Sequence, residues 1–231
     1  MIWVIIPTYN EELALPNTLK SVFQQMEPFR VIVVDGGSTD RTPDLIRRDS
    51  RITSFIAPKG RASQMNAGVH FVNHQQASAD DWLMFLHADT LLPPEAFEEL
   101  HRLRLDPAHQ AGGFRHQFSG KDWRLRMISW LDNFRCTRSH IVYGDQAVFV
   151  RQGLFKDLGG FPQQPFLEDV AFGEKLLTRT IPRLLPLTVI TDARKFIKMG
   201  VWRSLLRVLL IILHVEFGLP TLTPAFFQDV R

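Results

Sequence analysis

The chain has 231 residues, of which 45% are hydrophobic and 22% charged, the balance of an ordinary globular protein. Lys and Arg outnumber Asp and Glu by only 27 to 24, so the net charge gives no reason to expect a nucleic-acid partner. The single cysteine, Cys136, excludes an internal disulfide and is interpreted as a small buried hydrophobe. The first apolar run lacks a basic flank and stops at Pro7, which favours a strand over a signal peptide and hence a cytoplasmic protein.

Short apolar runs alternate with helical patterns through the first hundred residues. The runs show no polar alternation, which is typical of parallel strands covered on both faces, and they lie at 2–6, 31–35, 53–57 and 82–86. Helices are expected around 15–23, from an N-cap at Thr42, and over about 62–72 and 94–104. This order predicts an α/β fold with a doubly wound, mostly parallel sheet flanked by helices.

The pattern changes after residue 105, where a Gly-rich opening precedes an aromatic helix at 123–134 and a strand at 147–150. No linker rich in Ser, Gly or Pro separates this part from the first hundred residues. We therefore expect one domain over 1–200. Residues 201–231 are expected to form a C-terminal apolar helix and tail.

Polar residues follow three of the predicted strands. The segments are PTYNE at 7–11, DGGSTD at 35–40 and HAD at 87–89. In an open α/β sheet, ligands bind beyond the carboxyl ends of the strands, so these residues are expected to share one rim.

The residue types at this rim suit a nucleoside diphosphate. Asp35 can accept hydrogen bonds, and Gly36 allows a close approach to the backbone. Asp89 offers the oxygen ligand that Mg²⁺ or Mn²⁺ prefers, and Arg61 offers a fork of donors. Asp169, in the pair with Glu168, is a separate carboxylate that can accept the proton of a hydroxyl nucleophile.

Together these segments resemble family 2 glycosyltransferases, which have the GT-A fold. The resemblance spans about residues 2 to 200 and rests on ordered motifs: PTYNE, VVDGGSTDRT, GRASQMNAG, LHADT, GDQAVFVR, GGFP and FLEDV. The set LHADT, YGDQ and LEDV is similar, more narrowly, to a short bacterial subgroup of radical-SAM/selenodomain-associated transferases.

The resemblance implies transfer of a sugar from a nucleotide-diphosphate donor, UDP-sugars favoured, to a small-molecule or lipid-linked acceptor, usually with inversion. It implies Asp169, beside Glu168, as the catalytic base and Asp89 as a ligand of Mn²⁺ or Mg²⁺. The residues implied to contact the nucleotide are Pro7, Thr8, Tyr9, Asn10, Glu11, Asp35, Gly36, Arg61, His87 and Ala88. His87 stands where the family has the first acid of Asp-x-Asp, so it either ligates the metal through a neutral nitrogen or contacts ribose while Asp89 alone holds the metal.

Two other functions remain open. A non-catalytic nucleotide-binding sensor or assembly protein would explain His87 in place of an acid. A nucleotidyltransferase would need a glycine-rich loop with a basic residue after the first strand, where PTYNEE offers acids. The chain has no Gln-x-x-Arg-Trp pentapeptide after Asp169, which favours a single transfer over processive synthesis.

Several further residues have a structural and a functional interpretation. Asp145 and Gln146 either face the acceptor or form a tight turn. The aromatic stripe at 123–134 is expected to be core, with sugar stacking as the alternative. His70 and His74 have a metal-compatible spacing but no evident third ligand, which favours solvated surface.

The C-terminal segment combines basic residues at 194–207 with the apolar run VLLIIL at 208–213. Such a run is far shorter than the roughly 20 residues needed to span a bilayer. It is expected to pack on the domain or on a second subunit, or to attach peripherally to the inner face of the membrane.

Overall fold

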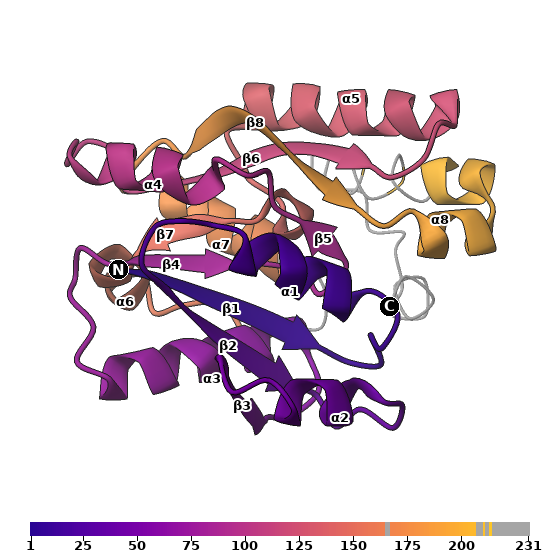
Figure 1. Cartoon of the computed structure of the whole chain (residues 1–231). Coiled ribbons are helices and arrows are strands. Elements are labelled where there is room, and N and C mark those ends of the chain that lie inside the picture. The colour runs from indigo at the N-terminus through magenta and orange to yellow at the C-terminus, as the bar shows by residue number, and fades with distance from the viewer. Residues whose placement is uncertain (165–166, 207–209, 211–212, 214–231) are drawn as a thin grey trace.

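The computed structural model describes residues 1–164, 167–206, 210 and 213 (Figure 1). The strands are β1 (Ile2–Thr8), β2 (Phe29–Asp35), β3 (Ile52–Ile56), β4 (Trp82–Phe85), β5 (Thr90–Leu91), β6 (Ala111–Phe118), β7 (Phe149–Arg151) and β8 (Arg183–Thr191). The helices are α1 (Leu15–Phe23), α2 (Thr42–Arg47), α3 (Arg61–His74), α4 (Ala96–Arg104), α5 (Trp123–Ser139), α6 (Gln152–Asp157), α7 (Glu168–Leu177) and α8 (Arg194–Met199), with a 3₁₀ turn η1 at Gly144–Gln146.

All of these strands belong to one 8-stranded sheet in the order β3-β2-β1-β4-β7-β6-β8-β5. β1 pairs in parallel with β2 and β4, and β6 pairs in parallel with β8. Only β7 and β5 run against their neighbours. The structure therefore confirms the predicted α/β fold with a mostly parallel sheet.

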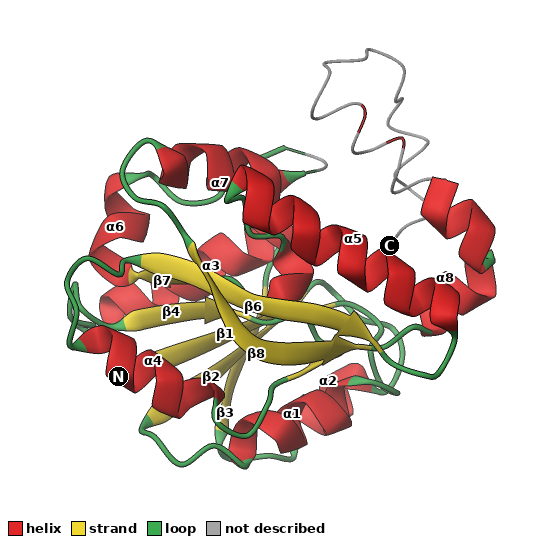
Figure 2. Ribbon diagram, turned by 90° about the horizontal axis from the view of Figure 1, so that it is seen from above, coloured by secondary structure: helices red, strands yellow, loops and turns green. Residues whose placement is uncertain are grey.

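Alternate residues of the parallel strands enter two separate cores. Ile2, Val4 and Ile6 of β1 join a cluster with α1 and α4, whereas Trp3 and Ile5 join a cluster with α3, α6 and α7. Figure 2 shows the sheet between these two sets of helices. Because both faces are covered there, the buried parts of β1, β2 and β4 are apolar, which is why they could be recognised in the sequence, whereas the edge strand β3 is largely exposed.

The second half of the chain adds strands to the same sheet, with α5 packed against β6. The predicted boundary at residue 200 stays a prediction. Cys136 is 2% exposed, which confirms its interpretation as a buried hydrophobe. Thr42 was expected to be the N-cap of α2, and this expectation was wrong. Thr42 is the first residue of the helix, and its hydroxyl accepts a hydrogen bond from the Glu11 amide at 2.9 Å.

The aromatic stripe on α5 is not core, so that expectation was wrong. Trp123, Trp130 and Phe134 are 58%, 62% and 51% exposed. The buried face of α5 is instead formed by Leu125, Ile128, Ser129, Asp132 and Cys136. His70 and His74 are exposed, as expected.

The predicted apolar helix at 208–213 lies outside the described residues except for Leu210 and Leu213. Among the described helices, none combines the length and the apolar character that crossing a bilayer requires.

Candidate active site

A cavity of about 360 Å³ opens beyond the carboxyl ends of β1 and β4, a size within the range of small-ligand sites. Many of the predicted site residues line it: Pro7, Thr8, Tyr9, Glu11, Arg61, His87, Ala88, Asp89 and Asp169. Asp145 also lines it. Four of the predicted residues are absent from its lining, namely Asn10, Asp35, Gly36 and Glu168.

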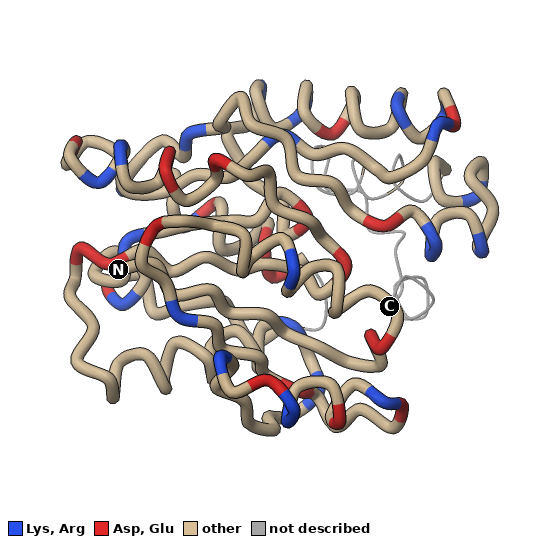
Figure 3. The backbone as a smooth tube through the Cα atoms, viewed as in Figure 1, with Lys and Arg blue, Asp and Glu red and all other residues tan. Residues whose placement is uncertain are grey.

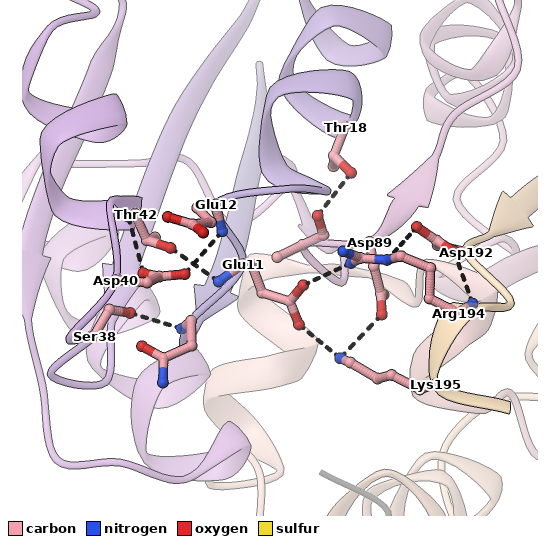
Figure 4. Close-up of polar contacts among 12 residues, drawn as sticks. Glu11, Glu12, Thr18, Ser38, Asp40, Thr42, Asp89, Asp192, Arg194 and Lys195 are labelled. Carbon is pink, nitrogen blue, oxygen red and sulfur yellow. Dashed lines mark hydrogen bonds and ion pairs between the residues drawn. The ribbon is translucent and has the colours of Figure 1, made fainter. Parts of the chain in front are cut away.

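At one end of the cavity, two carboxylates converge on a lysine from the C-terminal part of the chain. Lys195 Nζ lies 2.6 Å from Glu11 Oε1 and 3.2 Å from Asp89 Oδ2 (Figure 4). Arg194 Nη2 adds a contact of 3.3 Å to Glu11 Oε2. Both carboxylate side chains are nearly buried, with 10% of Glu11 and 11% of Asp89 exposed.

Burial and ion pairing act in opposite directions on the pKa values of Glu11 and Lys195. Burial raises the pKa of Glu11 although Lys195 acts in the opposite direction. For Lys195, burial acts to lower the pKa, but the charges of Asp89 and Glu11 outweigh it and the pKa is raised. Lys195 therefore stays charged at neutral pH and is the positive group that faces Asp89.

The arrangement around Asp89 fits a divalent cation. Asp89 is a carboxylate on the cavity wall, and such a carboxylate plus substrate phosphates is the usual environment of Mg²⁺ or Mn²⁺. Burial and the nearby Arg61 lower the pKa of His87, so its ring is neutral and able to act as a ligand. The lysine would have to leave Asp89 when a cation binds.

His87 and Asp169 meet at a glycine. The amide of Gly144 donates to Asp169 Oδ2 at 2.8 Å. A Cβ at Gly144 would lie 2.7 Å from His87 Nε2 and 3.3 Å from Asp169 Oδ2. Position 144 therefore needs a glycine for the histidine and the carboxylate to approach one backbone segment.

Glu168 and Asp169 have different surroundings at the start of α7. Asp169 lines the cavity, whereas Glu168 is 1% exposed and holds Arg61 through an Oε1 to Nε distance of 2.6 Å. Burial raises the pKa of Glu168 despite the opposing charge of Arg61. Glu168 thus positions Arg61, whose guanidinium lines the cavity near Asp169.

The carboxylate of Asp35 binds backbone amides of the loop that follows it. Its Oδ2 accepts hydrogen bonds from the amides of Gly37 and Ser38 at 3.0 and 2.9 Å. The rim is instead tied together by Gln64, whose side chain donates to the carbonyls of Thr8 and Val34, both at 2.8 Å. Gln64 lies in the quoted GRASQMNAG segment, but its role depends on contacts that the sequence does not show.

Asp145 and Gln146, for which the sequence allowed either a structural or a functional role, have different surroundings in the turn η1. Gln146 is 0% exposed and accepts from the Tyr143 amide at 2.9 Å, so it closes the turn. Asp145 lies on the cavity wall beside Asp132 of α5. Burial and the charge of Asp145 raise the pKa of Asp132 to about 7. Asp132 and its neighbour His116 were not anticipated from the sequence, because nothing local marks them as polar core residues.

The fold and the cavity define an α/β protein with acidic and basic side chains around a cavity of about 360 Å³. The sequence profile of glycosyl transferase family 2 matches residues 3–158, and the chain belongs to this family. The narrower subgroup suggested by the motifs stays a prediction.

Two similar proteins match part of this chain and part of their own length. Undecaprenyl-phosphate 4-deoxy-4-formamido-L-arabinose transferase of Pseudomonas aeruginosa is 29% identical over 150 residues, covering 60% of this chain and 42% of that protein. Poly-beta-1,6-N-acetyl-D-glucosamine synthase of Staphylococcus aureus is 26% identical over 194 residues, covering 76% of this chain and 45% of that protein. The chain thus spans less than half the length of these relatives.

Solved structures share the fold. The mannosyltransferase PcManGT of Pyrobaculum calidifontis, in complex with GDP-Man and Mn²⁺, gives a TM-score of 0.67 at 20% identity over 99% of this chain and 67% of that one. Residues 1–349 of S. aureus TarS, in complex with UDP-GlcNAc, give 0.62 at 19% identity over 84% of this chain and 58% of that one. The chain has the GT-A fold that the sequence predicted.

Proposed function

We propose that the protein transfers a glycosyl unit from a nucleoside-diphosphate sugar to an acceptor hydroxyl, in a single inverting displacement. The observation that carries the proposal is that Asp89 and Asp169 line one cavity from two different elements. Asp89 comes with Lys195, a group suited to a diphosphate, whereas Asp169 lies beside the neutral His87. We therefore assign the side of the cavity with Asp89 and Lys195 to the donor, as the donor end, and the side with Asp169 to the acceptor, as the acceptor end.

The proposed chemistry assigns a role to each end. The acceptor oxygen forms the new bond to the anomeric carbon while its proton passes to Asp169, and the bond from that carbon to the leaving phosphate oxygen breaks. The Gly144 amide holds Asp169 Oδ2 in place for this transfer. Lys195 and Arg61 are the chain's own cations along the cavity, where they can face the departing diphosphate.

A divalent cation, held by Asp89 with His87 as a second ligand, would neutralise charge on the leaving diphosphate. UDP-sugars remain the favoured donors by resemblance, and PcManGT and TarS were solved with GDP-Man and UDP-GlcNAc respectively. The sugar is to be identified by screening both nucleotide classes.

The test is the variant Asp169→Asn. Loss of a general base should lower the transfer rate by roughly 10²–10⁴-fold, while binding of UDP or GDP is retained. Asp157→Asn is the matched control, since Asp157 on α6 is a carboxylate with a 61% exposed side chain. Full activity in a correctly folded Asp169→Asn variant would refute the assignment. Stabilisation of the wild type by a diphosphate, with no turnover of any donor, would favour the sensor alternative.

We further propose that the acceptor is lipid-linked and that α5 and residues 201–206 contact the membrane surface that carries it. Trp123 lies next to Trp202, with ring centroids 6.3 Å apart, and Trp202 is 57% exposed. Of the basic residues of α8, which Figure 3 shows in blue, Arg194 and Lys195 pair with carboxylates, whereas Lys198 is exposed and, together with the aromatic side chains, suits an anionic interface. Trp123→Ser should weaken flotation with anionic vesicles and leave flotation with neutral vesicles unchanged. Equal flotation of the wild type with both vesicles would refute the proposal.

A further inference from the structure

A buried histidine faces two carboxylates deep beside the cavity. His116 Nδ1 lies 3.9 Å from Asp132 Oδ2, and His116 Nε2 lies 3.7 Å from Asp145 Oδ2. One potential ligand atom from each of the three residues lies within 4.8 Å of the other two. The residues come from β6, α5 and η1, so the fold rather than local sequence brings them together.

The histidine lacks the partners that a buried ring requires. Its side chain is 0% exposed, and neither ring nitrogen has a hydrogen-bond partner among the described residues. The distances to the two carboxylates exceed hydrogen-bond length. A buried polar group without a partner destabilises the fold, so the position indicates a ligand that completes it.

The backbone around the ring is fixed. Asn133 accepts a hydrogen bond from the His116 amide and donates one to its carbonyl, both at 2.8 Å. The ring packs edge-on against Phe118 with centroids 4.5 Å apart. β6 and α5 therefore hold His116 and Asp132 in register, as a preorganised site needs.

We propose that His116, Asp132 and Asp145 bind a divalent transition-metal ion, such as Zn²⁺ or Mn²⁺, at a site distinct from Asp89. A nitrogen and two carboxylates form a ligand set that suits such ions. Ligands about 2.1 Å from one tetrahedral ion lie about 3.4 Å apart, so ligand atoms that already lie within 4.8 Å of one another need side-chain rotations to close on an ion.

The surrounding charge favours a cation over a neutral occupant. Asp132 Oδ1 lies 3.4 Å from Arg135 Nη2. The guanidinium of Arg135 also lies over the ring of Tyr143, 3.7 Å from its centroid. The guanidinium of Arg135 thus faces Asp132, while Asp145 offers a second carboxyl group that a cation can approach. Because Asp132 and Asp145 line the cavity, the ion has open positions toward it, where an acceptor hydroxyl or phosphate can bind.

The test is binding of Co²⁺ or Zn²⁺ to the full chain without nucleotide, so its outcome does not depend on the proposed transfer reaction. Calorimetry should show one equivalent bound by the wild type. Asp145→Asn should weaken binding at least about tenfold. Asp145 suits this test because its side chain is 31% exposed and its replacement disturbs the core little.

Two controls separate this site from others. Asp157→Asn, which removes an exposed carboxylate of α6, should leave the nucleotide-free binding unchanged, and so should a variant that carries both His70→Gln and His74→Gln. That exposed histidine pair, with ring centroids 4.7 Å apart, is the alternative place for adventitious binding. Anomalous diffraction from Zn²⁺-soaked wild-type crystals needs no variant and should place the ion beside His116. Unchanged affinity in Asp145→Asn, or an anomalous peak only at another site, would overturn the proposal.

Discussion

Replacement of Lys195 by methionine tests the charge arrangement at the donor end of the cavity. Methionine keeps much of the length of the side chain and removes its ammonium. The variant leaves Asp89 without its ion-pair partner, while Glu11 keeps the weaker contact to Arg194 at 3.3 Å. Two nearly buried carboxylates would then face each other with less positive charge between them.

The expected cost follows from the exposure of the three groups. Breaking a buried ion pair costs roughly 3–5 kcal/mol and breaking an exposed one about 0.2–1 kcal/mol. The carboxylates are about nine-tenths buried, but the Lys195 side chain is 47% exposed, so water screens part of the interaction. We expect a loss of about 1–2 kcal/mol in the free energy of unfolding. For a chain of this size, that corresponds to about 2–8 °C in melting temperature.

The assay is thermal unfolding with and without Mn²⁺, with Lys198→Met on the same helix as control. Mn²⁺ should stabilise Lys195→Met more than the wild type, because the cation no longer competes with the ammonium for Asp89. Adding Asp89→Asn to Lys195→Met should remove this difference. A melting temperature of Lys195→Met equal to that of Lys198→Met would refute the ion-pair argument. An equal Mn²⁺ response in Lys195→Met and the wild type would refute a cation at Asp89.

Three shorter predictions concern the residues around the cavity and the core. Gly144→Ala should lower the transfer rate roughly 10–100-fold, because its Cβ would displace His87 and Asp169, and unchanged kinetics would contradict the close contact. Gln64→Leu should cost about 1–2 kcal/mol in urea unfolding, since it removes two hydrogen bonds to carbonyls at the ends of β1 and β2, and an unchanged midpoint would count against this role. Cys136, whose burial raises its pKa to about 11, should react with a thiol reagent at neutral pH only after unfolding, and rapid labelling of the native protein would disprove this.

The first half of the fold could be predicted because its strands are buried on both faces. The runs at 2–6, 31–35 and 82–86 are apolar without alternation, and the structure places β1, β2 and β4 there. β8 was not identified, since it contains Pro186 and pairs with β6 through a register shift between Phe114 and Arg115. Such an irregular strand depends on its neighbour more than on its own pattern.

The candidate site also contains residues that the sequence could identify and residues that depend on long-range contacts. Residues at strand ends, such as His87 and Asp89, could be predicted because the topology fixes their rim. Lys195 could not, because its contact to Asp89 joins residues 106 positions apart in the chain. The aromatics of α5 were wrongly predicted to be core, since helical spacing identifies a face but not which side of the helix is buried.

The donor end has a neutral histidine where the family resemblance implies an acid, and a lysine where the cation would bind. Glu11 and Asp89 are balanced by Lys195 and Arg194 before any ligand arrives. A diphosphate adds negative charge and attracts the lysine, and a lysine that leaves Asp89 exposes a carboxylate that a divalent cation can occupy. In the proposed reaction, diphosphate and cation would therefore favour each other's binding through the movement of one ammonium group, and by linkage the effect would be equal in both directions. As a ligand of the proposed cation, His87 would give this exchange a weak starting affinity, because a neutral ligand in place of an acid would leave the metal to depend on the substrate's own phosphates.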